Sequence, residues 1–282
     1  MIVDSHQHFW QVGRFDYPWM TPEVELLCRD YLPEMLEPIL QGNDVAQTVL
    51  VQASNSFEET QWLLELADQN SFIAGVVGWV DLQSDGTAQQ LDALTMHPKL
   101  KGIRHLVESE PADDWLTQPK VIRGLGELGA RELTYDLLVH SRHLKYATEA
   151  VAQCPETRFV VDHMAKPPIK SREIEEWARA LKPLAAFPNV SCKLSGLVTE
   201  ANWNNWRVED LKPYVETALE YFGPERMMFG SDWPVCLLAA TYGRVLEAFQ
   251  NLLAHLNEDE RRRMFSDNSI EFYRLEAEAI AA

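Results

Sequence analysis

The sequence predicts a single domain, residues 1–282, folded as a (β/α)8 barrel (TIM barrel) with an extra C-terminal helix. Short apolar segments rich in β-forming residues occur eight times, and each is followed by a segment with helical spacing. From His8 to Asp232 the repeated unit averages about 32 residues, the size of a strand-plus-helix crossover. The strands are almost continuously apolar, as parallel strands buried on both faces are.

Local sequence patterns predict where the individual helices and strands lie. A helix is expected to start at Ser56, because Ser56 with Glu59 three residues later forms a capping-box pattern. A further short helix should begin at 257–260 and close the bottom or flank of the barrel. The predicted strands are 2–5, 48–52, 73–80, 100–106, 134–139, 158–162, 190–194 and 227–230. Other helices are expected near 35–40, 88–94, 122–130, 144–152, 174–184, 211–222 and 245–253.

An open, doubly wound sheet also alternates strands and helices. That fold normally places a Gly-rich phosphate loop after its first strand, and this sequence has none there. The number of units and the missing loop therefore favour the closed barrel.

Composition excludes several classes of partner. The chain is 46% hydrophobic and 24% charged, as soluble globular proteins are, and its formal net charge is −18. This negative charge repels phosphate backbones and anionic membranes, so neither nucleic acid nor a membrane is expected as a partner. The arginines at 261–263 directly follow three acidic residues and are interpreted as part of a solvated helix face.

The predicted location is the cytoplasm. The segment after Met1 lacks the basic and apolar regions of a signal peptide, and no apolar run is long enough to span a membrane. The four cysteines lie far apart without a CxxC pair, so we expect reduced thiols.

Polar residues gather where the predicted strands end, which is where barrels of this kind build their active sites. Five of the eight histidines lie at such positions. The strand-end residues are His6-Gln7-His8, Arg104-His105, His140, Asp162-His163, Lys193, Ser195 and Ser231-Asp232.

The first of these motifs can bind a metal ion. Side chains alternate along a strand, so His6 and His8 face the same side about 7 Å apart while Gln7 points away. Two imidazoles in this arrangement can hold one ion. The alternative is structural, with the histidines satisfied in the core and Asp232 serving as a turn residue before Pro234.

The residues also suit cleavage of an ester or lactone. Attack of water on an acyl carbon needs a base, a group that stabilises the oxyanion and an acid for the leaving alcohol. Asp232 can serve as base and then as acid. Candidates for the oxyanion are a bound metal, Arg104, His105, His163 and Lys193. Arg104 and His105 are adjacent, so only one faces the lumen, and Lys193 could instead extend to the rim.

Aromatic residues near the strand ends could bind the apolar face of a sugar ring. Gln52 could bind hydroxyl groups, and packing in the core or in a lid is the alternative for the tryptophans. Beyond Arg104 and Arg142 few arginines are well placed, which argues against a dicarboxylate substrate. The aromatic candidates are Trp10, Trp19, Trp79 and Trp233.

The motifs together resemble the amidohydrolase superfamily, and within it the sugar-lactonase branch of L-fuconolactonase-like and L-rhamnonolactonase-like enzymes. The similarity covers nearly the whole chain. It rests on Asp4-Ser5-His6-Gln7-His8-Phe9-Trp10, Gly75-Val76-Val77-Gly78-Trp79-Val80-Asp81, Lys101-Gly102-Ile103-Arg104-His105, Val161-Asp162-His163 with Lys166-Pro167, Cys192-Lys193-Leu194-Ser195-Gly196, and Phe229-Gly230-Ser231-Asp232-Trp233-Pro234.

The resemblance implies a hydrolase that opens a small sugar-acid lactone. Asp232 would be the general base, with His163 orienting or polarising the water or the carbonyl. One divalent metal, zinc in the first instance, would be held by His6, His8, His140 and Asp232. Some relatives work without a metal, so metal-independent catalysis stays open.

The chain also departs from the wider superfamily. Arg104-His105 stands where other members carry a lysine at the end of the fourth strand, so a two-metal centre is not expected. Alternatives are a metal-dependent decarboxylase of the same superfamily, a lactonase of the pyrone-dicarboxylate or muconolactone type, and a barrel that binds a sugar acid without turnover.

Overall fold

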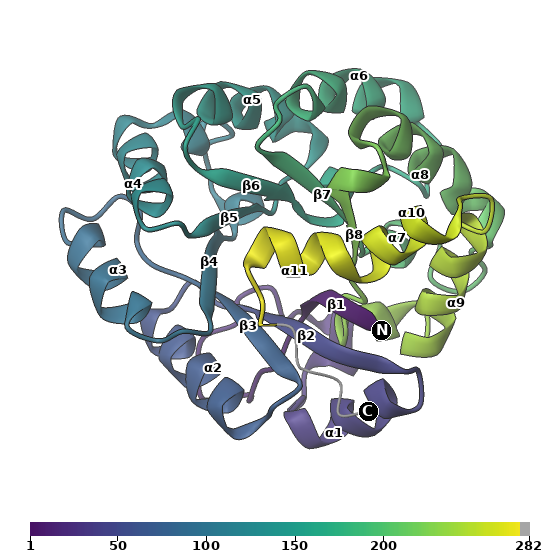
Figure 1. Ribbon diagram of the computed structural model, residues 1–282, viewed down its shortest axis with the longest axis horizontal. Coiled ribbons are helices and arrows are strands. Elements are labelled where there is room, and N and C mark those ends of the chain that lie inside the picture. Colours follow the sequence, from purple (N-terminus) through teal and green to yellow (C-terminus); the bar gives the residue numbers. More distant parts are fainter. Residues whose placement is uncertain (277–282) are drawn as a thin grey trace.

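The computed structural model describes residues 1–276 and confirms the predicted (β/α)8 barrel (Figure 1). Eight parallel strands pair in chain order, and the last returns to the first: His8 N donates to Trp233 O (2.7 Å) and Asp232 N to His6 O (2.8 Å). The strands are β1 (Ile2–Gln7), β2 (Val45–Val51), β3 (Ile73–Gly78), β4 (Leu100–His105), β5 (Thr134–Leu137), β6 (Arg158–Val161), β7 (Val190–Leu194) and β8 (Met227–Phe229).

An outer ring of helices surrounds the barrel, and every predicted helix is present. A short helix after β7, α7 (Leu197–Glu200), was not predicted. The ring consists of α1 (Pro33–Gln41), α2 (Phe57–Gln69), α3 (Thr87–Thr95), α4 (Pro119–Ala130), α5 (Leu144–Gln153), α6 (Ile174–Ala185), α8 (Val208–Phe222) and α9 (Tyr242–Leu252). None of the helices within residues 1–276 combines the length and apolar character needed to cross a bilayer.

The predicted capping box at the start of α2 forms only in part. Ser56 Oγ accepts the Glu59 backbone N–H (3.0 Å), as expected for an N-cap. Glu59 does not return the bond to Ser56; its Oε2 instead accepts Ala53 N (3.1 Å) and Ser54 N (2.9 Å). The carboxylate therefore holds the loop that follows β2.

Strand β1 runs two residues further than predicted and carries a register irregularity between Asp4 and Gln7. Asp4 lies between the first and last strands: its Oδ1 accepts Ser231 N (2.9 Å) and its Oδ2 accepts Tyr242 OH (3.0 Å). Burial raises the pKa of Asp4 to about 6. Gln7 Nε2 donates outward to Thr48 Oγ1 (3.1 Å), so His6 and His8 face the lumen as the alternation predicted.

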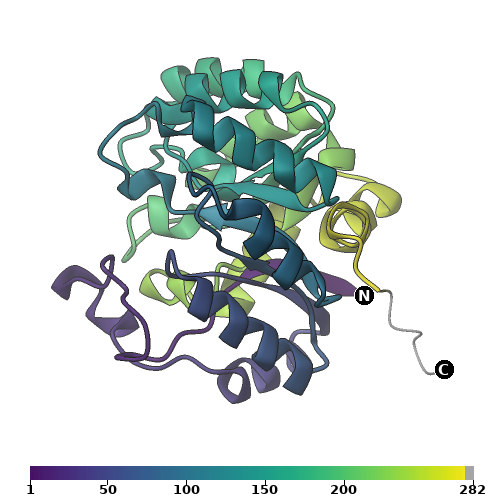
Figure 2. The same ribbon diagram turned by 90° about the vertical axis from the view of Figure 1, so that its left-hand side faces the viewer.

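The C-terminal segment closes the bottom of the barrel, as the sequence predicted. Helix α10 (Glu258–Arg262), a π-helical turn (Arg263–Asp267) and α11 (Asn268–Tyr273) cross the end at which the strands begin, opposite the long loop after β1 (Figures 1 and 2). Three of its side chains pack against inward-facing strand residues. This inner cluster consists of Val3, Val49, Val51, Val77, Val160, Met228, Phe272, Tyr273 and Leu275.

Candidate active site

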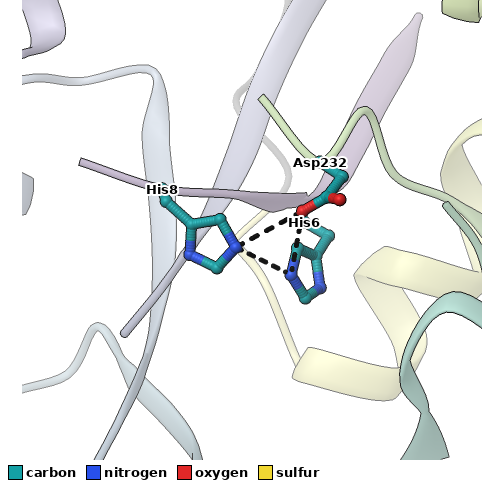
Figure 3. Close-up of side chains that lie close together, drawn as sticks. All are labelled: His6, His8 and Asp232. Carbon is teal, nitrogen blue, oxygen red and sulfur yellow. Dashed lines mark hydrogen bonds and ion pairs between the residues drawn. The ribbon is translucent and has the colours of Figure 1, made fainter. Parts of the chain in front are cut away.

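His6, His8 and Asp232 converge at the mouth of the barrel (Figure 3). The two Nε2 atoms lie 3.1 Å apart, and Asp232 Oδ1 lies 3.5 Å from His8 Nε2 and 3.8 Å from His6 Nε2. All three residues are buried. Asp232 takes a left-handed backbone conformation, with φ of 58°, which is uncommon for a residue other than glycine and often found at functional sites.

Hydrogen bonds hold both histidine rings in place beside Asp232. His8 Nδ1 lies 2.7 Å from Val51 O, and because a carbonyl only accepts, Nδ1 carries the proton. His6 lies between two cations: its Nε2 is 3.2 Å from Arg104 Nη1 and its Nδ1 is 3.0 Å from Lys193 Nζ. Both cations only donate, so a neutral His6 ring can accept from one of them at a time. Burial lowers the pKa of both histidines, so both are neutral near pH 7.

These three residues fit a divalent transition metal. Two imidazole nitrogens and one carboxylate oxygen within 4.8 Å of one another match the ligand atoms of catalytic zinc sites, where three protein ligands leave one position open. The backbone carbonyl that fixes His8 is the kind of outer partner that metal-binding histidines use.

His163 lies beside this group on the turn that follows β6. Its Nε2 is 3.9 Å from Asp232 Oδ1, and its Nδ1 is 2.9 Å from Ser195 Oγ. Burial lowers the pKa of His163 to about 4, so the ring is neutral. The four successive residues from His163 to Lys166 have positive φ. This left-handed turn directs the His163 ring into the site.

Asp232 is a carboxylate at neutral pH. Burial alone would favour its protonated form, but the neighbouring His163 and His8 rings outweigh burial and lower its pKa below the usual range. The group can therefore accept a proton.

The structure decides which of the adjacent residues Arg104 and His105 faces the lumen. Arg104 points inward and pairs with Asp162 Oδ2 (3.1 Å). His105 points away: its ring stacks on Trp115 with centroids 4.0 Å apart, and its Nδ1 accepts Trp79 Nε1 (2.9 Å).

A cavity of about 180 Å³ opens above this cluster. Its floor carries polar side chains and its walls are largely apolar, as in small-molecule sites. The polar lining residues are His8, Arg104, Glu108, His163, Lys166, Thr199, Glu200 and Asp232, and the others are Trp10, Trp19, Val24, Leu27, Ala53, Leu106, Leu138, Gly196, Val235 and Leu238.

Several residues predicted for the site lie outside this lining. His140 Nε2 lies 3.4 Å from Glu108 Oε2, and His140 belongs to neither group of potential metal ligands found within residues 1–276. Gln52 Oε1 lies 3.3 Å from Arg104 Nη2, so Gln52 positions that arginine. Trp233 packs edge-on against Phe9 and Tyr31.

The other predicted residues outside the lining are His6, which belongs to the cluster described above, and Lys193, Trp79 and His105. Lys193 is fully buried below His6 and pairs with carboxylates inside the barrel. Trp79 and His105 bind each other outside the lumen. Of the residues predicted to bind substrate, Trp10, Trp19 and Arg104 line the cavity.

Four polar lining residues, Glu108, Lys166, Thr199 and Glu200, were not among the predicted site residues. Glu108 and Lys166 pair with each other, and burial raises the pKa of Glu200 to about 7. Glu108 and Glu200 lie beyond the ends of β4 and β7, outside the strand-end positions that were searched. Lys166 belongs to the Lys166-Pro167 motif, one of the motifs on which the family resemblance rests, so the sequence did indicate this residue.

Comparison with known proteins identifies the family. Residues 3–275 match the family model described as Amidohydrolase, and the chain belongs to that family. It is 40% identical over 280 residues to the L-fucono-1,5-lactonase of Burkholderia ambifaria, covering 97% of this chain and 96% of that protein. The L-fucono-1,5-lactonase of Burkholderia multivorans is 39% identical, over 97% of this chain and 96% of that protein.

A solved structure agrees with this assignment. The amidohydrolase from Burkholderia multivorans with bound Zn superimposes with a TM-score of 0.94 at 37% identity, covering 98% of this chain and all of that one. The predicted resemblance to the sugar-lactonase branch of the amidohydrolases is therefore confirmed, and the chain is an amidohydrolase-type enzyme.

Proposed function

We propose that this enzyme hydrolyses a neutral sugar-acid lactone of the L-fucono-1,5-lactone type. The observation that carries the proposal is the position of the Asp232 carboxylate, within 3.9 Å of His6, His8 and His163 on the floor of a cavity of sugar size. The similarity to two L-fucono-1,5-lactonases over nearly the whole chain supports this substrate class.

Asp232 is the proton carrier in this mechanism. As a carboxylate it accepts a proton from the water that attacks the lactone carbonyl carbon, and it then returns the proton to the ring oxygen as the acyl–oxygen bond breaks. One residue thus serves as base and acid in turn, and the product is the open hydroxy acid.

His163 and Arg104 stabilise the negative charge that develops on the carbonyl oxygen. Ser195 Oγ can donate to His163 Nδ1, and with this bond formed the proton of the neutral ring is on Nε2, on the side that faces Asp232. The Arg104 guanidinium also borders the cavity, where Asp162 holds it in place. Donors fixed before the reaction stabilise an oxyanion most effectively.

His6, His8 and Asp232 are the proposed ligands of one divalent metal ion, with zinc as the first candidate. When bound, the ion supplies Lewis acidity to the lactone carbonyl. His140 contacts Glu108 at the cavity rim, so we leave it out of this ligand set.

Substrate recognition divides between stacking and hydrogen bonding. Trp10 and Trp19 pack edge to face with centroids 5.0 Å apart and offer an apolar wall to a sugar ring. Glu108, Lys166 and Glu200 offer acceptors and donors to hydroxyl groups. The three acidic side chains in the lining, Glu108, Glu200 and Asp232, disfavour a dicarboxylate. The proposal includes a cytoplasmic location, where an exposed thiol such as Cys28 stays reduced.

A panel of aldonolactones, with acid release followed by a pH indicator, tests the proposal. We expect turnover of L-fucono-1,5-lactone by zinc-loaded enzyme, loss of activity after chelation and recovery when zinc is added back. Hydrolysis that survives complete metal removal would instead support metal-independent catalysis. No hydrolysis of any lactone by folded, zinc-loaded enzyme would overturn the proposal, and carbon dioxide release from an aromatic acid would favour a decarboxylase.

A further inference from the structure

Two side chains of the cavity come from one strained turn. The successive residues His163, Met164, Ala165 and Lys166 have φ between 49° and 59°, in the left-handed region that L residues rarely adopt. Within the turn, Lys166 N donates to His163 O (2.9 Å). Four such residues in succession are costly, so contacts from outside the turn must hold it in this conformation. Because His163 and Lys166 both line the cavity, whatever holds the turn also places these two side chains.

Trp177 supplies such a contact from outside the barrel. It lies on α6 and is fully buried. Its Nε1 donates to Met164 O (2.7 Å), a carbonyl in the middle of the turn. Without this donor a buried carbonyl would lose its partner, so the bond favours the conformation in which Met164 O faces α6.

Tyr214 anchors the end of the same segment. Its ring, on α8, packs edge to face on Trp177 with centroids 5.5 Å apart, and its hydroxyl donates to Pro168 O (3.2 Å). Helices α6 and α8 lie side by side in the outer ring (Figure 1). The segment is therefore bound on both sides of Lys166 by two aromatic residues that also support each other.

The alternative is that Trp177 only fills space in the core and that its N–H takes the nearest carbonyl, as buried indoles usually do. The two roles differ in their consequences, because only a bond that holds the turn affects His163 and Lys166 together.

We propose that Trp177 is a positioning residue. Its bond to Met164 O holds the strained turn, and the turn keeps His163 beside Asp232 and Lys166 beside Glu108. The effect on turnover rests on the proposed lactonase function, whereas the effect on the turn itself does not.

The principal test uses Trp177→Phe, which removes the N–H donor and keeps an aromatic ring. The matched control is Trp62→Phe, because Trp62 is also buried on a helix of the outer ring, α2, where its indole packs on Phe15. A third variant adds Ala165→Gly to Trp177→Phe. Glycine adopts positive φ readily, so it should let the turn keep its conformation without the bond. The measurements are kcat, KM, the melting temperature and hydrogen exchange at the Lys166 amide, followed by NMR.

We expect Trp177→Phe to lower kcat about 10-fold and to raise KM about 3- to 10-fold, because His163 and Lys166 are displaced together. The Lys166 amide should exchange about 10-fold faster, since the turn opens more often. Trp62→Phe should stay within twofold of wild type in all three quantities even if its melting temperature falls as far. The double variant should recover most of the loss.

A folded Trp177→Phe variant with kcat, KM and Lys166 exchange within twofold of wild type would overturn the proposal. Equal changes in Trp62→Phe, or no recovery in the double variant, would also overturn it, because core packing would then explain the result. A wild type that hydrolyses no lactone overturns only the proposed function, because exchange at the Lys166 amide still decides this one.

Discussion

Gly196 lies directly against His163: a Cβ atom on Gly196 would be 2.5 Å from His163 Nδ1 and 2.6 Å from its Cγ. Gly196 also has φ of +66°, which L side chains rarely adopt. The residue therefore allows the chain to turn after β7 while His163 keeps its place beside Asp232.

Gly196→Ala should displace the His163 ring and lower kcat about 10- to 100-fold, because a small misplacement of a catalytic group costs about this much. The matched control is Gly13→Ala, since Gly13 also has positive φ (+81°) but no atom within 4 Å of its Cβ position. Steady-state kinetics measure the effect of displacing His163, and thermal melting measures the backbone strain that both substitutions introduce. If Gly196→Ala keeps wild-type kcat, the contact with His163 does not matter for turnover.

Asp232→Asn should lower kcat about 10³-fold or more, because the amide cannot carry the proton between water and leaving group. Zinc content must be measured on the same sample, since Asp232 is also a proposed metal ligand. Ligand binding by the variant can be followed with the open hydroxy acid. Unchanged turnover would favour a barrel that binds a sugar acid without cleaving it.

Glu200→Gln should raise KM about 10-fold or more while kcat changes little, because a hydrogen bond to a charged group contributes about 1.5–3 kcal/mol. Burial raises the pKa of Glu200 to about 7, so its ionised form, the stronger acceptor, appears above that pH. The wild-type enzyme should therefore bind lactone more tightly as the pH rises through 7, and the variant should lose this dependence. Glu209→Gln, at an exposed position on α8, is the control. A pH-independent KM in the wild type would contradict the assignment.

Glu59→Gln should remove part of the pH dependence of stability. Burial raises the pKa of Glu59 to about 7 from its usual 4.5, so the folded state holds this proton more tightly than the unfolded state. Its contribution is fully present below pH 4.5 and is lost as the pH rises through 7, an effect on the order of 3 kcal/mol.

Urea unfolding at pH 5 and pH 8 measures this contribution. The free energy of unfolding of the wild type should fall more between the two pH values than that of Glu59→Gln. Glu65→Gln, at an exposed position on the same helix, should behave as the wild type does. Equal slopes for wild type and Glu59→Gln would show that Glu59 ionises in the folded state without cost.

The sequence by itself determined the fold and the location of the site. Short, almost continuously apolar segments identify the strands, and helical spacing identifies the helices, because burial on both faces of a parallel strand and on one face of a helix imposes these patterns locally. The side-chain alternation that places His6 and His8 on one face is likewise a local property of a strand. In a parallel barrel all strands end at one mouth, so the strand-end position of Asp232 was enough to place it with the histidines.

The tertiary structure decided which polar residues reach the cavity. Arg104 rather than His105 faces inward because the register of the closed barrel sets the orientation of β4, which alternation alone leaves open. Lys193 turns toward Asp136 and Asp162, partners 57 and 31 positions away in the chain. Glu108 and Glu200 come from loops, whose paths depend on packing between distant segments. Such contacts have no period in the sequence, since they depend on how the whole barrel closes.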